Sequence, residues 1–249
     1  MRLPIPATYE RAVLTKIENL RIKSYTDPYV LRLQQVVTGM LTPGNLYAWE
    51  YVFSRLTSPS PVVEIGAFCG LSTNLITYFK RRHNRANRFV TCDRWDYGFK
   101  GLSDAPLVPG TSVTGTDFGR FARETFIRNT MLWSRDDLPS AIELSSGELF
   151  VAWQQAAQCR DLFDRPVQLG GPISFCFIDG NHEYDAVKAD FEHTDRFLER
   201  GGWILFDDSA NLSGSPGTRR LMKELRTTGV FGGPYEVVLK NPHYLVRKR

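Results

Sequence analysis

Three aspartates lie at the ends of two strongly apolar segments of the sequence. Asp179 closes the run Ile173–Asp179, and Asp207 and Asp208 close the run that begins at Trp203. If these runs are neighbouring strands, the carboxylates meet at one sheet edge, where protons or a cation must relieve their repulsion. Oxygen ligands of this kind suit Mg²⁺. The sequence therefore predicts a magnesium site on Asp179, Asp207 and Asp208; the alternative is that they bond local amides or cap a turn.

His182 follows Asp179 at the start of the next expected helix. Beside a cation, an imidazole can act as the general base that accepts a proton from a bound hydroxyl. We therefore predict catalytic roles for His182 and Asp179, with a structural histidine as the alternative. The other histidines share no ligand spacing with His182, so zinc is not expected.

A second set of residues has the types and spacing of a nucleotide-binding turn. Gly66 and Gly70 follow the first apolar strand, and their missing side chains let a ligand approach the backbone. Ser72 and the free amides of the next helix favour an anionic group such as a cofactor carboxylate. Asp93 ends the second strand, where a carboxylate can accept both hydroxyls of a ribose. The alternatives are a structural turn and a solvent-facing acid.

Ser146 and Gly147 follow the third expected strand. In a sheet of parallel strands this position lies near the same edge, so we predict that an adenine ring lies there. The glycine spacing after Glu64 differs from GxGxxG, which disfavours a nicotinamide dinucleotide.

These residues need a sheet to bring them together, and the chain alternates apolar strands with helices. The run 173–178 is continuously apolar, which is typical of a parallel strand covered on both faces. We therefore expect an α/β fold with a doubly wound, mostly parallel sheet and a terminal antiparallel hairpin. Strands are expected at 62–66, 88–93, 141–144, 173–179, 203–207, 235–239 and 243–246, and helices at 71–82, 118–133, 148–163 and 184–200.

The expected caps and boundaries follow from local signals. Asp117 is expected to cap the helix over 118–133, and Gly201-Gly202 to end the helix before the fifth strand. Helices are expected within 8–40, with a break near Asp27-Pro28, and over 44–56. We predict two parts, a helical extension or cap over 1–57 and a cofactor-binding domain over 58–249 in which residues 97–117 form a flexible lid loop.

Composition narrows the classes of partner. The net charge is +4 and the pI about 8.9. This mildly basic composition permits a nucleic-acid partner, but the chain lacks the dense patch of basic residues that a dedicated nucleic-acid binder usually has. The basic stretch 80–88 ends a helix, where cations complement the dipole. The four cysteines form no CxxC pair, so free thiols are expected. No apolar run approaches the ~20 residues of a membrane span, and we expect a soluble, cytoplasmic protein with no membrane partner.

Two sequence motifs resemble those of class I S-adenosylmethionine (SAM)-dependent methyltransferases. VVEIGAFCGLST (62–73) looks like the first motif of that family, in its catechol-type form. FIDGNHEYDAVKADF and LERGGWILFDD look like the macrocin-type sugar O-methyltransferases. The likeness covers roughly residues 60–210. Catechol-type enzymes place a lysine base after the strand-four acid, whereas Asn181, His182 and Glu183 fill that stretch here, so the histidine-bearing sugar enzymes are the closer analogy.

The resemblance implies a seven-stranded Rossmann-like sheet of order 3-2-1-4-5-7-6 with the last strand antiparallel. It also implies an Mg²⁺ site on Asp179, Asp207 and Asp208, and an adenine near Ser146 and Gly147. The contacts to SAM that it implies are Glu64, Gly66, Ala67, Ser72 and Asp93.

Together these observations predict a SAM-dependent enzyme that methylates a hydroxyl on a small molecule, a sugar or another natural product, with Mg²⁺. The resemblance concerns the chemistry of the site and does not identify the acceptor. Three alternatives remain open: an RNA methyltransferase, a nicotinamide-dependent oxidoreductase and a non-catalytic SAM-binding module. A homo-oligomer is compatible with the sequence.

Overall fold

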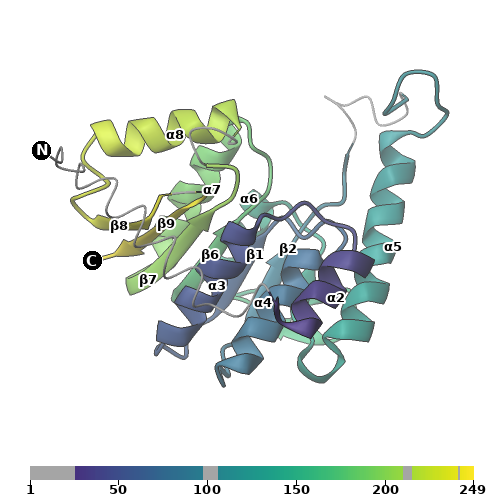
Figure 1. Ribbon diagram of the computed structural model, residues 1–249, viewed down its shortest axis with the longest axis horizontal. Coiled ribbons are helices and arrows are strands. Elements are labelled where there is room, and N and C mark those ends of the chain that lie inside the picture. Colours follow the sequence, from purple (N-terminus) through teal and green to yellow (C-terminus); the bar gives the residue numbers. More distant parts are fainter. Residues whose placement is uncertain (1–25, 98–105, 210–214, 241) are drawn as a thin grey trace, which may run out of the picture.

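The central feature of the computed structural model is one seven-stranded sheet (Figure 1). The model describes residues 26–97, 106–209, 215–240 and 242–249. The sheet has the order β3-β2-β1-β6-β7-β9-β8. Its strands are β1 (Val62–Ile65), β2 (Phe89–Cys92), β3 (Ser140–Ile142), β6 (Ile173–Ile178), β7 (Leu198–Phe206), β8 (Tyr235–Leu239) and β9 (Tyr244–Lys248).

The pairing confirms the expected topology. β1, β2, β3, β6 and β7 pair in parallel, whereas β9 is antiparallel to both β7 and β8. β4 (Gln158–Arg160) and β5 (Pro166–Gln168) form a separate antiparallel pair. Without this pair, the main sheet follows the predicted order 3-2-1-4-5-7-6. The carboxyl ends of its five parallel strands therefore lie at one edge, where ligands bind in open α/β sheets.

Helices cover both faces of the sheet, as Figure 1 shows. Alternate residues of β6 face opposite ways: Phe177 packs against α3, with its ring 5.3 Å from that of Trp49, while Cys176 and Ile178 face the cluster of α7 and α8. None of the helices in the described ranges is long and apolar enough to cross a membrane. The α-helices are α2 (Pro28–Val36), α3 (Pro43–Arg55), α4 (Leu71–Arg82), α5 (Gly115–Trp133), α6 (Ser146–Gln154), α7 (Tyr184–Phe197) and α8 (Pro216–Thr227).

Two predicted boundaries are wrong. The helix expected over 148–163 ends at Gln154, and the β4–β5 pair follows it. The Gly201-Gly202 pair lies inside β7, because α7 already ends at Phe197. Gly201 has a φ of +83°, so it allows a turn of the chain within the strand segment without ending a helix.

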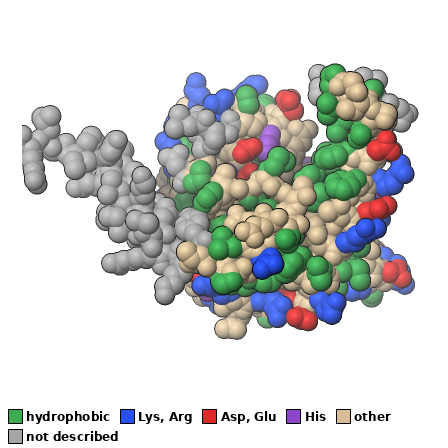
Figure 2. Space-filling model, turned by 45° about the vertical axis from the view of Figure 1, so that its right-hand side comes forward, with side chains coloured by type: hydrophobic (Ala, Val, Ile, Leu, Met, Phe, Trp, Pro, Cys, Tyr) green, Lys and Arg blue, Asp and Glu red, His purple; other side chains and the backbone are tan. Residues whose placement is uncertain are grey.

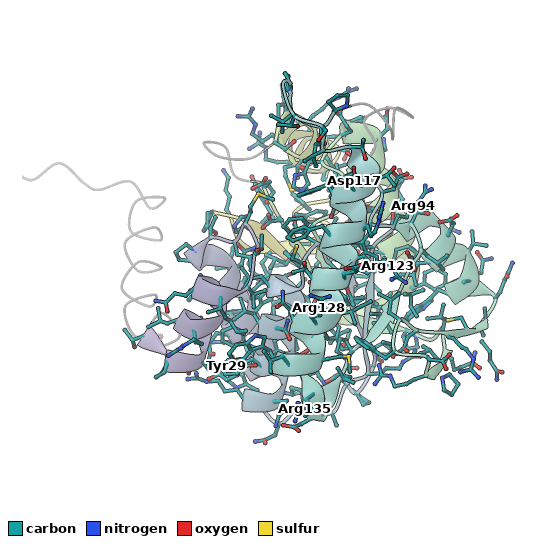
Figure 3. The ribbon with its side chains drawn as sticks, turned by 90° about the vertical axis from the view of Figure 1, so that its right-hand side faces the viewer. Tyr29, Arg94, Asp117, Arg123, Arg128 and Arg135 are labelled. Atoms are coloured by element: carbon teal, nitrogen blue, oxygen red, sulfur yellow. The ribbon has the colours of Figure 1, made fainter. Side chains whose placement is uncertain are left out.

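The helix expected over 118–133 begins earlier, at Gly115. Its N-cap is Thr114, whose hydroxyl accepts a hydrogen bond from the Asp117 amide at 3.1 Å, while the Asp117 carboxylate accepts one from the Thr114 amide at 3.2 Å. Asp117 is thus the third residue of a capping box and not the cap itself. Figure 3 shows Asp117 at the start of α5 and Arg135 just beyond its end.

Two other local predictions fall partly outside the described residues. Residues 115–117 of the expected lid loop belong to α5, and residues 98–105 lie outside the described ranges. The break near Asp27-Pro28 is confirmed, because Asp27 caps α2 and Pro28 is its first residue, a position that proline favours. The helix expected before that break lies outside the described residues.

Candidate active site

A cavity of about 1150 Å³ lies at the carboxyl ends of the parallel strands. Its wall is formed by the segments that follow β1, β2, β3, β6 and β7, together with residues 38–42 between α2 and α3. In Figure 2 acidic and histidine side chains lie side by side in the upper part of the molecule, beside the α5 column. The predicted site residues that line the cavity are Gly66, Ala67, Ser72, Asp93, Ser146, Gly147, Asp179, His182, Asp207 and Asp208.

The glycine turn after β1 brings the backbone of two strand ends into contact. Gly66 has a φ of +89°, and a Cβ there would lie 2.1 Å from the carbonyl oxygen of Asp179. Gly70 also has a φ of +89° and precedes α4, which no described side chain caps. The first amides of α4, next to Ser72 at the cavity wall, are therefore available to an anionic group.

Asp93 holds this turn from the neighbouring strand. Its Oδ2 accepts hydrogen bonds from the amides of Ala67 (3.0 Å) and Phe68 (2.9 Å), and its Oδ1 accepts one from the amide of Trp95 (2.7 Å). A carboxylate oxygen has two lone pairs, so Oδ1 retains one for a hydroxyl in the cavity. The sequence predicted a ribose acceptor here, and the structure adds that the same carboxylate fixes the turn.

Glu64 lies behind the cavity wall. It is fully buried, and its Oε2 accepts hydrogen bonds from the hydroxyls of Thr73 (2.5 Å) and Thr91 (2.7 Å). Burial raises its pKa to about 7, against the lowering effect of the hydroxyls of Ser72, Thr73 and Thr91. Glu64 therefore ties α4 and β2 to β1.

The acidic end of the cavity brings together residues that follow two neighbouring strands. Ligand atoms of Asp179, His182 and Asp207 all lie within 4.8 Å of one another. Burial and the nearby charge of Asp207 hold the pKa of Asp179 well above its usual value. Such a shift marks carboxylates that are too close to be charged together without a neutralising partner.

Asp208 lies on the other side of the His182 ring. The distance from His182 Nε2 to Asp179 Oδ1 is 3.3 Å, and the distance from His182 Nδ1 to Asp208 Oδ2 is 3.5 Å. Asp208 has a φ of +43°, a left-handed conformation that strains a residue with a side chain. The geometry therefore groups the half-buried Asp179 and the buried Asp207 with His182, and places Asp208 beside the second ring nitrogen of His182.

The start of α8 holds the backbone of His182. The Ser215 hydroxyl donates a hydrogen bond to the His182 carbonyl oxygen at 3.1 Å. A Cβ at Gly217 would lie 2.2 Å from that same oxygen, so the close packing of α8 requires glycine there. Two helices, α7 and α8, thus determine where the imidazole lies.

Two residues that the sequence analysis missed hold Asp207. Asn45 Nδ2 donates a hydrogen bond to Asp207 Oδ1 at 2.6 Å, and His243 Nδ1 lies 3.3 Å from the same oxygen. Burial lowers the pKa of His243. The register of β7 and β9 explains why His243 lies beside Asp207. Phe206 pairs with Tyr244, so the next residue after β7, Asp207, lies opposite the residue before β9, His243.

The start of α6 also lines the cavity. Ser145 caps α6 in a capping box with Glu148, and the half-buried Ser146 and Gly147 form the first turn of the helix at the cavity wall. Nearby, the buried Asp190 on α7 also lines the cavity, and burial raises its pKa to about 6. Asp190 is another wall residue that the sequence analysis missed.

Part of the cavity wall is aromatic. The rings of Phe68, Tyr97 and Phe118 all line the cavity and contact one another, with centroids 5.2 to 6.0 Å apart. Phe68 adopts a φ of +45° within the glycine turn. This wall gives a bound molecule an apolar surface next to the turn.

The basic stretch 80–88 does not line the cavity. Lys80 is buried and pairs with Asp137 at 2.7 Å, and Arg82 pairs with Asp27 at 2.8 Å. Arg85 donates to the carbonyl oxygen of Phe53. Much of the charge in this stretch therefore forms ion pairs and hydrogen bonds with other residues of the fold.

Comparison with known proteins comes from a family model and from solved structures. The family model, described as a methyltransferase domain, matches residues 63–209. The calicheamicin methyltransferase CalS11 is 16% identical with a TM-score of 0.53, over 88% of this chain and 91% of that one. Cofactor-bound Rv0187 from MTB is 14% identical with a TM-score of 0.54, over 100% and 99%.

A third solved structure is the O-methyltransferase TomG from Streptomyces achromogenes, involved in tomaymycin synthesis and solved in complex with SAM. It is 13% identical with a TM-score of 0.51, over 89% of this chain and 90% of that one. Likeness at these identities establishes a shared fold. The search of curated proteins gives no significant match.

Proposed function

Because the chain belongs to the methyltransferase-domain family, we propose that it transfers the methyl group of SAM to a hydroxyl of a small molecule with the help of Mg²⁺. The membership confirms the family expected from the two motifs. The observation that carries the proposal is that the glycine turn and the acidic cluster line one cavity of about 1150 Å³. A cavity of this size can hold a nucleoside cofactor and an acceptor together.

In this proposal SAM lies across the strand ends. Its carboxylate faces Ser72 and the uncapped start of α4, its ribose hydroxyls face Asp93, and its adenine lies against Ser146 and Gly147. These assignments are supported by the available amides and by the acceptor capacity left on Asp93 Oδ1. The SAM complex of TomG, which shares the fold, also supports SAM as the cofactor.

The acidic end fits a hard divalent cation. The half-buried carboxylate of Asp179, the buried carboxylate of Asp207 and an imidazole converge there, and desolvation together with repulsion from Asp207 raises the pKa of Asp179. Asp179 and Asp207 would hold the ion, with Asp208 as the third acid of the predicted set. When bound, the ion supplies positive charge that lowers the pKa of a substrate hydroxyl.

The protein's own residues then position the acceptor and move the proton. His182 Nε2 accepts the proton of the acceptor hydroxyl, and Asp208, 3.5 Å from Nδ1, stabilises the imidazolium that forms. Residues 38–42 line the cavity, where they would help to keep water from the reacting groups. We propose that the extension over 1–57 caps the domain 58–249, and that the predicted lid over 97–117 includes only residues before Gly115, where α5 begins.

Asp207→Ala tests the metal-specific role. We expect turnover to be lost while SAM affinity, measured by calorimetry, is largely kept, because Asp207 lies at the acidic end and not at the turn. Chelation should also remove activity in the native protein, and added Mg²⁺ should restore it. Equal loss of turnover and SAM affinity in a folded variant contradicts the proposal.

An RNA acceptor is the main alternative. It predicts a basic surface beside the cavity and activity that falls steeply with salt. The basic stretch 80–88 lies away from the cavity and is largely paired, which favours the small acceptor. Assays on a small diol and on RNA at two salt concentrations separate the two. Cytoplasmic location and a homo-oligomeric state stay predictions.

A further inference from the structure

The Asp207 carboxylate is contacted by side chains from segments far away in the sequence, through one hydrogen bond and one close electrostatic contact. Asn45 Nδ2 lies 2.6 Å and His243 Nδ1 lies 3.3 Å from its Oδ1. All three residues are at most 5% exposed. Asn45 and His243 both lie outside the segment 63–209 that matches the family model. The contacts thus connect the site to the start of α3 and the last strand.

Thr42 fixes both of these partners. Its backbone amide donates to Asn45 Oδ1 at 2.9 Å. Since the amide oxygen of Asn45 is occupied in this way, its NH₂ group must face Asp207. The Thr42 hydroxyl lies 2.6 Å from His243 Nε2. One residue, the N-cap of α3, therefore orients both side chains that reach the carboxylate.

The chemistry of the contact sets the direction of each hydrogen. An ionised carboxylate only accepts hydrogen bonds, so the ring nitrogen of His243 that faces Asp207 must carry hydrogen. His243 Nδ1 is buried and makes no regular hydrogen bond among the described residues, so its 3.3 Å contact with Asp207 Oδ1 is a close electrostatic contact. In this tautomer Nε2 is an acceptor for the Thr42 hydroxyl, whose oxygen lies 2.6 Å from Nε2 and 3.1 Å from Asn45 Oδ1. The chain of contacts runs from Thr42 through His243 to Asp207.

We propose that Asn45 and His243 are positioning residues that hold Asp207 Oδ1, so that Oδ2 is the oxygen available to the cation. The proposal rests on the cation site of the proposed function. Without these two donors, repulsion from Asp179 turns the Asp207 carboxylate away, because nothing opposes it. Groups that orient metal ligands in this way contribute about 10- to 100-fold to metal affinity.

The test is Mn²⁺ binding to the full chain, measured by calorimetry without substrate. We expect Asp207→Ala to abolish binding, and Asn45→Ala and His243→Leu each to weaken it about 10- to 100-fold. His243→Asn should keep most of the Mn²⁺ affinity that His243→Leu loses, because the amide N–H of the asparagine takes the place of Nδ1. Chain folding is checked by circular dichroism.

Asn87→Ala is the matched control. Asn87 is also buried, but its amide donates to the carbonyl oxygens of Ser58 and Ser60 at the amino ends of the strands. We expect a lower Tm with unchanged Mn²⁺ affinity. If Asn45→Ala and His243→Leu bind Mn²⁺ like the native chain, or weaken it no more than Asn87→Ala, the positioning proposal is overturned. If the native chain binds no Mn²⁺, the cation site itself fails.

Discussion

The two ends of the cavity are built in different ways. The turn end is mostly backbone from one short stretch, residues 66–72, held by the single carboxylate of Asp93. The acidic end consists of side chains from the segments that follow β6 and β7, from α3 and from the residue before β9. A site of backbone groups is sensitive to added atoms, whereas a site of converging side chains is sensitive to each atom removed.

Gly66→Ala is expected to have the largest effect, because the two ends meet at this residue. The new Cβ would lie 2.1 Å from the Asp179 carbonyl oxygen, at a φ of +89°. Neither backbone can move without displacing a strand, so we expect destabilisation of about 4 kcal/mol or more. Chemical denaturation measures it.

Gly147→Ala is the control for this substitution. Nothing lies within 4 Å of a Cβ at Gly147, and alanine is the better helix former by up to about 1 kcal/mol. The free energy of unfolding of Gly147→Ala should equal or exceed that of the native chain. If both variants lose the same stability, the contact between the two ends is not what makes Gly66 necessary.

Glu64→Gln should change how stability depends on pH. The pKa of Glu64 is about 7 in the folded protein, above its usual 4.5. Its neutral form is favoured by folding, so its contribution is fully present below pH 4.5 and is lost as pH rises to about 7. At about 1.4 kcal/mol per pKa unit, the stability of the native chain relative to Glu64→Gln should fall by about 3 kcal/mol across this window.

Urea unfolding of both chains at several pH values measures this difference. The result also separates the two ends of the cavity, since Glu64 supports the turn and does not line the wall. A difference that does not change between pH 4.5 and pH 7.5 would contradict a buried carboxyl that is protonated on folding.

Asp179→Asn is expected to have the smallest effect on stability, and in the opposite direction. Burial and Asp207 raise the pKa of Asp179, so removing its charge relieves repulsion in the metal-free protein. We expect Tm to rise by about 2–4 °C at pH 8, which corresponds to about 1 kcal/mol in a chain of this size. The gain should shrink at pH 5.

Thermal unfolding with and without Mg²⁺ completes this test. Bound ion stabilises the native chain by mass action, and the variant should lose that stabilisation. A variant that is less stable than the native chain without metal would show that the two carboxylates do not repel.

Much of the fold and the turn end could be predicted from the sequence because the signals are local. The glycines at 66 and 70 and the following helix lie within a few residues of each other, and the apolar run 173–178 indicates a buried parallel strand. The boundaries that were wrong, at Gln154 and Gly201, depend on pairing and turns that periodicity does not report.

Asn45 and His243, the two residues that contact Asp207, could not be found by the same reasoning. Asn45 lies in a helix with no recognisable motif, and His243 shares no spacing with the other histidines. Their meeting depends on how α3 packs and on the register of β9. Long-range packing of this kind is invisible to a local pattern.

β9 joins the last hairpin to the rest of the sheet. β8 and β9 follow each other in the chain and pair with one another, and of the two only β9 pairs with β7. Pairing of β9 with β7 joins residues far apart in the sequence, and such non-local pairing forms slowly. His243 immediately precedes β9, so the step that adds this strand to the sheet also brings His243 to Asp207.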